Sequence, residues 1–173
     1  KEKLNKIYDK NIFFVKKSDI EKHLNTINFF EKVEIKKKYP ETLIVNIFET
    51  KPMAVLFKNK SKYFIDSSSN LISFEESMNF KELPNVFGDN AEEKFINFLR
   101  QLESNNFATS KIKNFYFFQI DRWDLQLMDD KIIKFPFNNV DRAIKKSVEL
   151  LKRKDFENYK IIDLRIDGKI IVE

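Results

Sequence analysis

Residues 112–135 read IKNFYFFQIDRWDLQLMDDKIIKF and carry the clearest folding signal in the chain. Aromatic and β-branched residues, which favour strands, dominate this stretch, and Asp residues, which favour turns, interrupt it. The pattern predicts three antiparallel strands, at Ile112 to Asp121, Trp123 to Met128 and Lys131 to Phe135. We interpret the aromatic run Phe115-Tyr116-Phe117-Phe118 and Trp123 as core residues of this sheet.

Short apolar runs upstream predict three further strands. Asn, Asp and Ser separate these runs, and such residues form turns by bonding their own backbone. The predicted strands are Ala54 to Phe57, Tyr63 to Ile65 and Leu71 to Ile72.

Two helices and a closing hairpin complete the C-terminal part. One helix is expected after Asn90, because Glu93 follows at the spacing of a helix start. The other is expected after Asn138-Asn139, and its apolar face comprises Ile144, Val148 and Leu151. The chain then closes with the strand Ile161 to Ile166, the turn Asp167-Gly168 and the strand Ile170 to Val172.

The first 51 residues predict a separate small unit. Apolar spacing indicates a helix over residues 2–8, and a second helix is expected over about Asp19 to Thr26. Alternating residues from Phe30 to Lys36 and from Leu43 to Phe48 then predict a hairpin.

Pro52 marks the exit from this hairpin, because proline interrupts regular structure. A length of 173 residues allows one domain or two small ones. We therefore predict an α+β fold with two domains, residues 1–51 and residues 52–173. The second is expected to be a mostly antiparallel β domain with two main helices.

The composition excludes several kinds of site. Gly88 and Gly168 are the only glycines, so neither a dinucleotide fingerprint nor a phosphate-binding loop can be written. With no cysteine and only His23, the chain cannot form a Cys/His zinc site or a thiol nucleophile. We interpret His23 as a helix-surface residue and expect no catalytic, metal or cofactor site.

The net charge of +5 first raises the question of nucleic-acid binding. The excess is spread along the chain, and its one dense cluster, Lys36-Lys37-Lys38, lies on a predicted strand that sends side chains to both faces. Nucleic-acid binding therefore remains a minor alternative.

Acidic pairs offer a second alternative, hydrolysis by two facing carboxylates. Asp129-Asp130 and Glu75-Glu76 are explained as turn residues. Within Asp121-Arg122-Trp123-Asp124, we interpret Arg122 and the acids as a surface pair beside a core tryptophan.

The end of the chain can be read in two ways. The closing strand either pairs into the sheet on both sides or leaves one side open, where a partner strand could add. On the residues alone, the two readings are evenly balanced.

Five segments in the same order resemble the bacterial cell-division family FtsQ/DivIB, and the form of two of them is similar to alphaproteobacterial members. They are Val33 to Ala54 with its Tyr39-Pro40-Glu41-Thr42-Leu43-Ile44-Val45 hairpin, Phe64-Ile65-Asp66, Leu83-Pro84-Asn85-Val86-Phe87-Gly88, Arg122-Trp123-Asp124-Leu125 and Ile162-Asp163-Leu164-Arg165. No single segment is specific, but their order matches the predicted elements.

The resemblance implies a POTRA domain over residues 1–51, with the order strand, two helices, two strands and its first strand preceding or overlapping Lys1. It also implies a single membrane-spanning helix upstream of this fragment, anchorage in the cell inner membrane, and a periplasmic location at the division septum. The runner-up expectation is another POTRA-bearing module, for outer-membrane assembly or secretion.

The resemblance further implies a non-enzymatic divisome scaffold that links early and late division proteins. Its partners would be FtsB with FtsL, and indirectly FtsK and the FtsW-FtsI synthase. The family's partner-binding strand maps onto Leu164, Arg165, Ile166, Asp167, Gly168, Lys169, Ile170, Ile171 and Val172.

The sequence departs from the family at three positions. Ile166 stands where an aromatic residue is common, which removes an expected aromatic anchor. Asn70 replaces a turn glycine, which we expect to be harmless because asparagine tolerates left-handed backbone geometry. Glu173 ends the chain where partner contact would continue, so we expect part of the interface to lie beyond this fragment.

Overall fold

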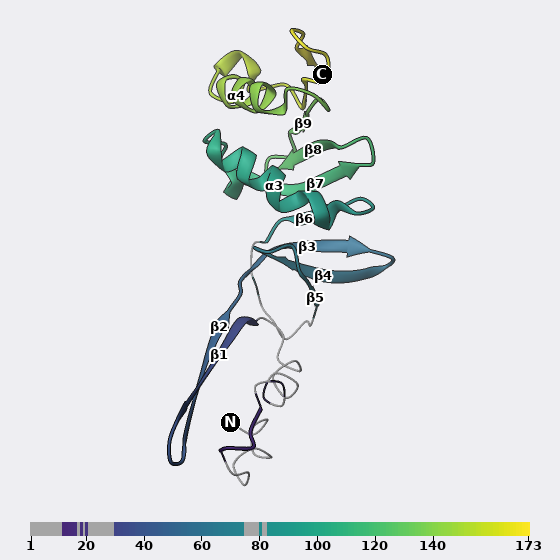
Figure 1. Cartoon of the computed structure of the whole chain (residues 1–173). Coiled ribbons are helices and arrows are strands. Elements are labelled where there is room, and N and C mark those ends of the chain that lie inside the picture. Colours follow the sequence, from purple (N-terminus) through teal and green to yellow (C-terminus); the bar gives the residue numbers. More distant parts are fainter. Residues whose placement is uncertain (1–11, 17, 19, 21–29, 75–79, 81–82) are drawn as a thin grey trace. The chain divides into compact units, whose positions relative to one another are not determined.

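The computed structural model describes residues 12–16, 18, 20, 30–74, 80 and 83–173 (Figure 1). The chain divides into two compact units, Lys1–Lys51 and Pro52–Glu173. Of the two helices predicted near the N-terminus, the one over residues 2–8 lies outside the described residues. The second lies almost entirely outside them, although Ser18 and Ile20 have helical backbone.

The first unit contains the predicted hairpin. Strands β1 (Phe30–Lys38) and β2 (Thr42–Glu49) pair antiparallel, with a cis peptide bond before Pro40 in the turn. The core comprises Val15, Ile20 and Val33, with Ile35, Leu43 and Val45 packed against it. Leu43 and Val45 face this core while Ile44 and Asn46 are exposed, which is the period-two pattern of a half-buried strand.

The second unit is built on a nine-stranded sheet with the order β11-β10-β9-β8-β7-β6-β3-β4-β5. Its strands are β3 (Pro52–Lys58), β4 (Ser61–Asp66), β5 (Leu71–Ser73), β6 (Asn85–Phe87), β7 (Ile112–Phe118), β8 (Arg122–Leu127), β9 (Ile132–Lys134), β10 (Ile161–Asp163) and β11 (Ile171–Val172). The predicted three-strand meander is confirmed as β7, β8 and β9.

Most neighbouring strands pair antiparallel, but β6 is parallel to β3 and β7, and β9 is parallel to β10. Helix α3 (Ala91–Ser104) connects β6 to β7, and α4 (Val140–Leu150) connects β9 to β10. Parallel neighbours need such crossovers, because a tight turn can join only antiparallel strands. The predicted α+β class with two main helices and a mostly antiparallel sheet is therefore confirmed.

Both helices pack on one face of the sheet and share its core. The ring of Phe98 on α3 stacks on Trp123 at 5.1 Å and 2° between ring planes, and Phe95 meets Phe115 edge to face. The α4 face differs slightly from the prediction: Leu150 is buried and Leu151 is exposed, because the helix ends at Leu150.

The aromatic run on β7 divides between the two faces of the sheet. Phe115 and Phe117 are buried as predicted. Tyr116 lies on the other face and stacks on Phe87, and Phe118 is exposed, so the prediction that the whole run is core is wrong for these two residues. Strand alternation is the physical reason.

Turns without glycine use Asn, Asp, Ser and Lys in left-handed conformations. Asn59 and Lys60 both have positive φ in the two-residue turn between β3 and β4, as a type I′ hairpin requires. In the turn after Asp66, the positive φ falls on Ser69 and not on Asn70. The Asp66 carboxylate instead accepts hydrogen bonds from the backbone amides of Ser68 and Asn70.

Both helices begin after an asparagine, as predicted. The asparagine contributes a left-handed backbone conformation there and not a side-chain cap. Asn90 and Asn139 have φ values of 60° and 57°, and neither side chain makes a capping hydrogen bond.

No helix in the described part of the chain is both long enough and apolar enough to cross a membrane. The remaining helical turns are short: η2 (Thr109–Lys111) and η3 (Lys154–Phe156).

Candidate partner-binding edge of the sheet

The C-terminal strand β11 is the last strand of the nine-stranded sheet. It comprises only Ile171 and Val172, and β10 ends at Asp163. The predicted strand from Ile161 to Ile166 is therefore wrong beyond Asp163, because residues 164–170 form a connection between two short strands. Among the described residues, β11 pairs only with β10, and its other side is open.

The backbone groups on the open side follow from the hydrogen bonds to β10. The amide of Glu173 donates to the carbonyl of Ile161 at 3.2 Å, and the amide of Ile161 donates to the carbonyl of Glu173 at 3.1 Å. Successive residues of an antiparallel pair alternate between facing the partner and facing away. The amide and carbonyl of Val172 consequently point away from β10.

The nine residues predicted to bind a partner fall into three structural groups. Leu164 is buried in the core, and its amide donates to the carbonyl of Lys134 at 2.9 Å. Residues 165–170 form an exposed connection, and Ile171 and Val172 form the edge strand. Within the connection, Gly168 has φ +73° and open space around it, and the amide of Lys169 donates to the carbonyl of Ile166 at 3.1 Å.

Exposed isoleucines give this edge an apolar character. Ile166 is 51% exposed, Ile170 39% and Ile171 43%. Apolar side chains on an open strand are available for contact with alternate residues of an added strand. Leu164, by contrast, supports the edge from beneath and is not available for such contact.

Arg165 is held in place by Asp163. The guanidinium donates to both carboxylate oxygens, with Nε at 2.9 Å from each and Nη2 at 2.5 Å from Oδ2, and the Arg165 amide donates to Oδ1 at 3.0 Å. Burial by itself raises the pKa of Asp163, but the hydrogen bonds from Arg165 and the nearby positive charges outweigh it and lower that pKa. The same contact raises the pKa of Arg165.

A second ion pair lies on the same side of the sheet. Arg122 Nε is 3.4 Å from Asp124 Oδ1, and the two side chains are only 17% and 10% exposed. The predicted surface pair is thus wrong about exposure, because the Arg122 guanidinium lies over the ring of Phe118 and Asp124 is buried. Burial raises the pKa of Asp124, and the charges of Arg122, Arg165 and Lys134 oppose that shift.

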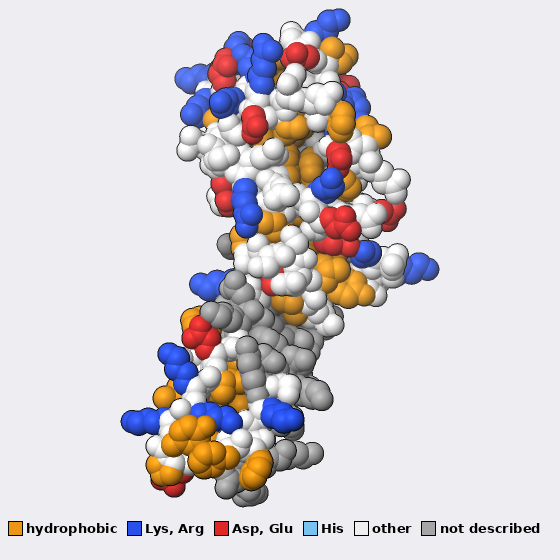
Figure 2. Space-filling view, in the orientation of Figure 1, with side chains coloured by type: hydrophobic (Ala, Val, Ile, Leu, Met, Phe, Trp, Pro, Cys, Tyr) orange, Lys and Arg blue, Asp and Glu red, His pale blue; other side chains and the backbone are white. Residues whose placement is uncertain are grey.

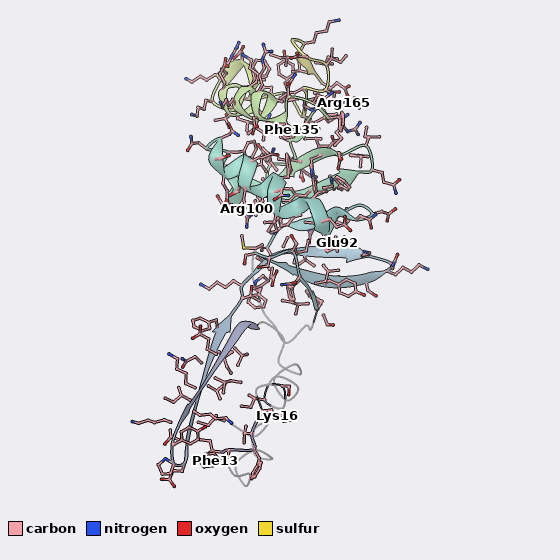
Figure 3. All side chains as sticks on the ribbon, viewed as in Figure 1. Phe13, Lys16, Glu92, Arg100, Phe135 and Arg165 are labelled. Carbon is pink, nitrogen blue, oxygen red and sulfur yellow. The ribbon has the colours of Figure 1, made fainter. Side chains whose placement is uncertain are left out.

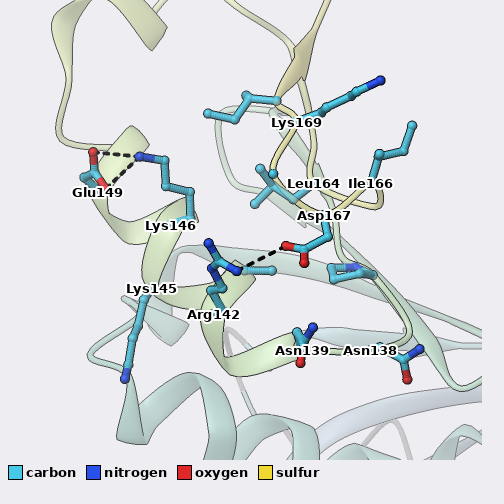
Figure 4. Close-up of a pocket in the computed structure, with 14 residues that line it drawn as sticks. Asn138, Asn139, Arg142, Lys145, Lys146, Glu149, Leu164, Ile166, Asp167 and Lys169 are labelled. Atoms are coloured by element: carbon cyan, nitrogen blue, oxygen red, sulfur yellow. Dashed lines mark hydrogen bonds and ion pairs between the residues drawn. The ribbon is translucent and has the colours of Figure 1, made fainter.

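A cavity of about 410 Å³ lies beside the edge, between α4 and the connection (Figure 4). Four cationic side chains line it: Arg142, Lys145, Lys146 and Lys169. Two acids also line it, and each is paired. Arg142 Nη1 is 3.5 Å from Asp167, and Lys146 Nζ is 2.9 Å from Glu149. The cavity combines residues from two distant segments, so no local sequence pattern could predict it.

The sequence also did not identify Lys131 as a residue that supports this edge. Its side chain is buried, and its ammonium donates to the carbonyls of Phe156 and Glu157 at 3.1 Å each and to that of Tyr159. Those carbonyls lie just before β10. Lys131 therefore ties the start of β10 to the turn between β8 and β9.

Among the described residues, the acidic pairs named from the sequence do not meet in the cavity. Asp129 and Asp130 are exposed, and Glu75-Glu76 lies outside the described residues. Asp124 and Asp163 are buried, but each faces arginine and neither lines the cavity. The described residues thus give the hydrolase alternative no support.

Comparison with known proteins matches the second unit to one family. The family model "Cell division protein FtsQ/DivIB, C-terminal" matches residues 54–165. Two similar proteins named "Cell division protein FtsQ" come from Rickettsia bellii and Rickettsia prowazekii. Each is 26% identical to the chain over 94% of its length and is itself 61% covered. A third, from Agrobacterium fabrum, is 26% identical over 83% of the chain, with 46% of its own length covered. The chain thus spans about three fifths of the length of the Rickettsia proteins.

Proposed function

The chain belongs to the FtsQ/DivIB family of cell division proteins, and we propose that it is a non-enzymatic scaffold of the divisome. In this proposal the second unit binds division partners, and the first unit, Lys1–Lys51, is a POTRA domain. The family match over residues 54–165 supports a role in division over the alternative of a secretion or outer-membrane assembly module.

We assign the binding of FtsB, together with FtsL, to strand addition at β11. One observation carries this proposal: β11 ends the sheet, and the Val172 backbone faces its open side. Backbone hydrogen bonds to an added strand would supply affinity, and contacts with Ile170 and Ile171 would supply selectivity. A strand could bind there without exposing any buried core residue.

The residues around β11 support a preformed binding edge. Asp163 restrains Arg165, and Lys131 restrains the segment before β10. A restrained edge loses less conformational entropy on binding than a mobile one. The cationic side of the adjoining cavity favours a partner segment that carries acidic residues next to its added strand.

The wider assembly follows from the same proposal. The scaffold would contact FtsK and the FtsW-FtsI synthase indirectly, and an upstream membrane-spanning helix would anchor it in the inner membrane. The described units would then lie in the periplasm at the division septum. These partners and this location are proposed for the whole protein, of which the chain is a part.

Proline substitution at Val172 tests strand addition directly. Val172→Pro removes a backbone donor that faces the open side and leaves the pairing of Glu173 with Ile161 intact. Calorimetric titration with a periplasmic FtsB peptide should show affinity about tenfold lower than wild type. The loss of one backbone hydrogen bond and of close packing against the added strand together cost about 1.4 kcal/mol of binding free energy. Ile166→Pro would be a poorer test, because Ile166 lies in the connection and not on a strand.

The opposite edge of the sheet provides the matched control. Among the described residues β5 pairs only with β4, and the Asp66 amide donates to the Asn70 carbonyl, so the Leu71 amide faces away from β4. Leu71→Pro should leave FtsB affinity unchanged. Unchanged affinity in a folded Val172→Pro variant would refute binding at β11. A loss in Leu71→Pro alone would place the added strand at β5.

A further inference from the structure

The end of the β1–β2 hairpin carries an exposed aromatic cluster. Phe13, Phe14 and Tyr39 are 66%, 77% and 57% exposed. Figure 3 shows Phe13 beside the turn of the hairpin. We call these three residues, with Lys16, Lys36, Lys37 and Lys38, the aromatic tip.

The aromatic tip is held together by contacts within the unit. The rings of Phe13 and Tyr39 stack with centroids 4.8 Å apart, and Lys37 Nζ lies 3.5 Å from the carbonyl oxygen of Phe13. These contacts join the segment before the first described helical residues to the hairpin turn. The rings of Phe13 and Tyr39 are therefore displayed together, and exposed Phe14 follows Phe13 directly in the chain.

The small core of the unit does not need these rings. It comprises Val15, Ile20 and Val33, whereas Phe14, directly before buried Val15, is exposed. Large apolar side chains that remain exposed together indicate a surface that contacts something other than water. The question is which kind of surface.

The charges of the aromatic tip indicate which kind of surface it contacts. Four lysines lie within the tip, and the only acid between Lys36 and Thr42 is Glu41. None of the described carboxylates forms an ion pair with Lys36, Lys37 or Lys38. Figure 2 shows hydrophobic side chains gathered beside lysines at this end of the unit. The aromatic tip thus combines apolar rings with a local excess of positive charge.

The geometry points to reversible docking of the aromatic tip on a membrane surface that contains anionic phospholipid. Aromatic rings are favoured at the boundary between headgroups and acyl chains, and lysines near them are attracted by negative headgroups. A hairpin end can place its side chains into that boundary, which accepts apolar groups to a depth of about 5–10 Å. This inference is independent of the proposed binding at β11.

Sedimentation with lipid vesicles tests the docking in the 173-residue chain. Vesicles of phosphatidylethanolamine with phosphatidylglycerol should bind the chain, and vesicles of phosphatidylcholine alone should bind it at least about tenfold more weakly, because they offer no net negative charge. Added salt should weaken the binding, since exposed charges are screened. Equal binding to both vesicles, or none to either, would overturn the inference.

Paired variants assign the binding to the aromatic tip. Phe14→Ser with Tyr39→Ser, and separately Lys36→Gln with Lys38→Gln, should each reduce vesicle affinity about tenfold. The controls make similar changes at exposed sites of the second unit: Phe137→Ser removes one exposed ring, and Lys152→Gln with Lys154→Gln removes two exposed lysines. Equal losses in the controls would show unspecific attraction and refute a role for the tip.

A tryptophan in place of Phe14 reports whether this side chain enters the lipid, by a measurement separate from vesicle affinity. The emission of Phe14→Trp should shift to the blue when phosphatidylglycerol vesicles are added, because the indole leaves water. Trp123, the only native tryptophan, is 5% exposed and provides a constant background. Binding of this variant without a blue shift would mean that the rings do not enter the lipid, and it would contradict the proposal.

Discussion

The centre and the C-terminal edge of the nine-stranded sheet are stabilised in different ways. At the centre, β7 and β8 are seven and six residues long, and Phe98, Phe115 and Trp123 pack between the sheet and α3. At the edge, β10 and β11 have three and two residues. There the chain is restrained by buried Leu164, by Lys131 and by the pair of Asp163 with Arg165.

This difference suits an edge that binds a partner. A short edge strand resists unwanted pairing with other chains, because it offers few backbone groups. Few groups also mean that a specific partner has to add side-chain contacts of its own. Because aromatic packing is concentrated at the centre, changes at the edge should not propagate into the core.

The two glycines give the largest expected contrast between centre and edge. Gly88 has φ +120°, and a Cβ there would lie 2.3 Å from the carbonyl oxygen of Phe117. Gly88→Ala should lower the free energy of unfolding by about 4 kcal/mol, from backbone strain plus the clash. Gly168→Ala, with open space around it, should lower it by about 1 kcal/mol. Urea denaturation measures both, and equal losses would contradict the comparison.

Removal of the Lys131 ammonium should have the next largest effect. Lys131→Met leaves three carbonyls before β10 without their donor, and the unfolding free energy should fall by about 2 kcal/mol. Lys113→Met is the control, because Lys113 is half exposed and pairs only with exposed Asp130. Its loss should stay below about 0.5 kcal/mol. Hydrogen exchange in Lys131→Met should rise at residues 156–163 and not on β7.

The Asp163 carboxylate should make a smaller, pH-dependent contribution to the free energy of unfolding. Its pKa in the folded protein lies below the ordinary value of 3.8, so its stabilisation is present above that value and disappears as the pH falls through the folded pKa. Asp163→Asn should lose about 1 kcal/mol at pH 7, because half-exposed Arg165 limits the value of the pair.

Acid denaturation of the two proteins checks that sign. The stability difference between wild type and Asp163→Asn should shrink as the pH falls below about 4. Asp124 has a raised pKa and acts in the opposite direction, but it is present in both proteins. A difference that grows in acid would mean that the Asp163 carboxylate does not stabilise the edge.

The smallest effect is expected at the wall of the cavity. Arg142 and Asp167 are 76% and 65% exposed, and their closest atoms are 3.5 Å apart. Asp167→Ala should change the unfolding free energy by less than about 0.5 kcal/mol in thermal and urea denaturation. A loss comparable to that of Lys131→Met would show that this wall is a structural element and not an open binding surface.

Local patterns in the sequence predicted most of the individual elements. The β7–β9 meander, the β1–β2 hairpin and both helices of the second unit lie where periodicity and turn residues indicated. The errors have local causes as well. The strand predicted to reach Ile166 ends at Asp163, where the carboxylate accepts a hydrogen bond from the amide of Arg165.

The candidate site could be predicted only in part. The assignment of residues 164–172 to partner binding comes from the family resemblance around Asp163 and stays a prediction. The contribution of Lys131, the shielding of Arg122 with Asp124, and the cavity beside α4 were not recognised from the sequence. Each of these features depends on segments that are distant in the chain and adjacent in space.

The sequence by itself determined most of the described strands, helices and turns, and which family the chain resembles, because periodicity and turn chemistry act between near neighbours. The tertiary structure decided the strand order, the outward direction of the Val172 backbone and the lining of the cavity. The physical reason is that strand pairing and burial arise between distant residues. Which strand lies at the edge of the sheet is set only by the pairing of all the other strands.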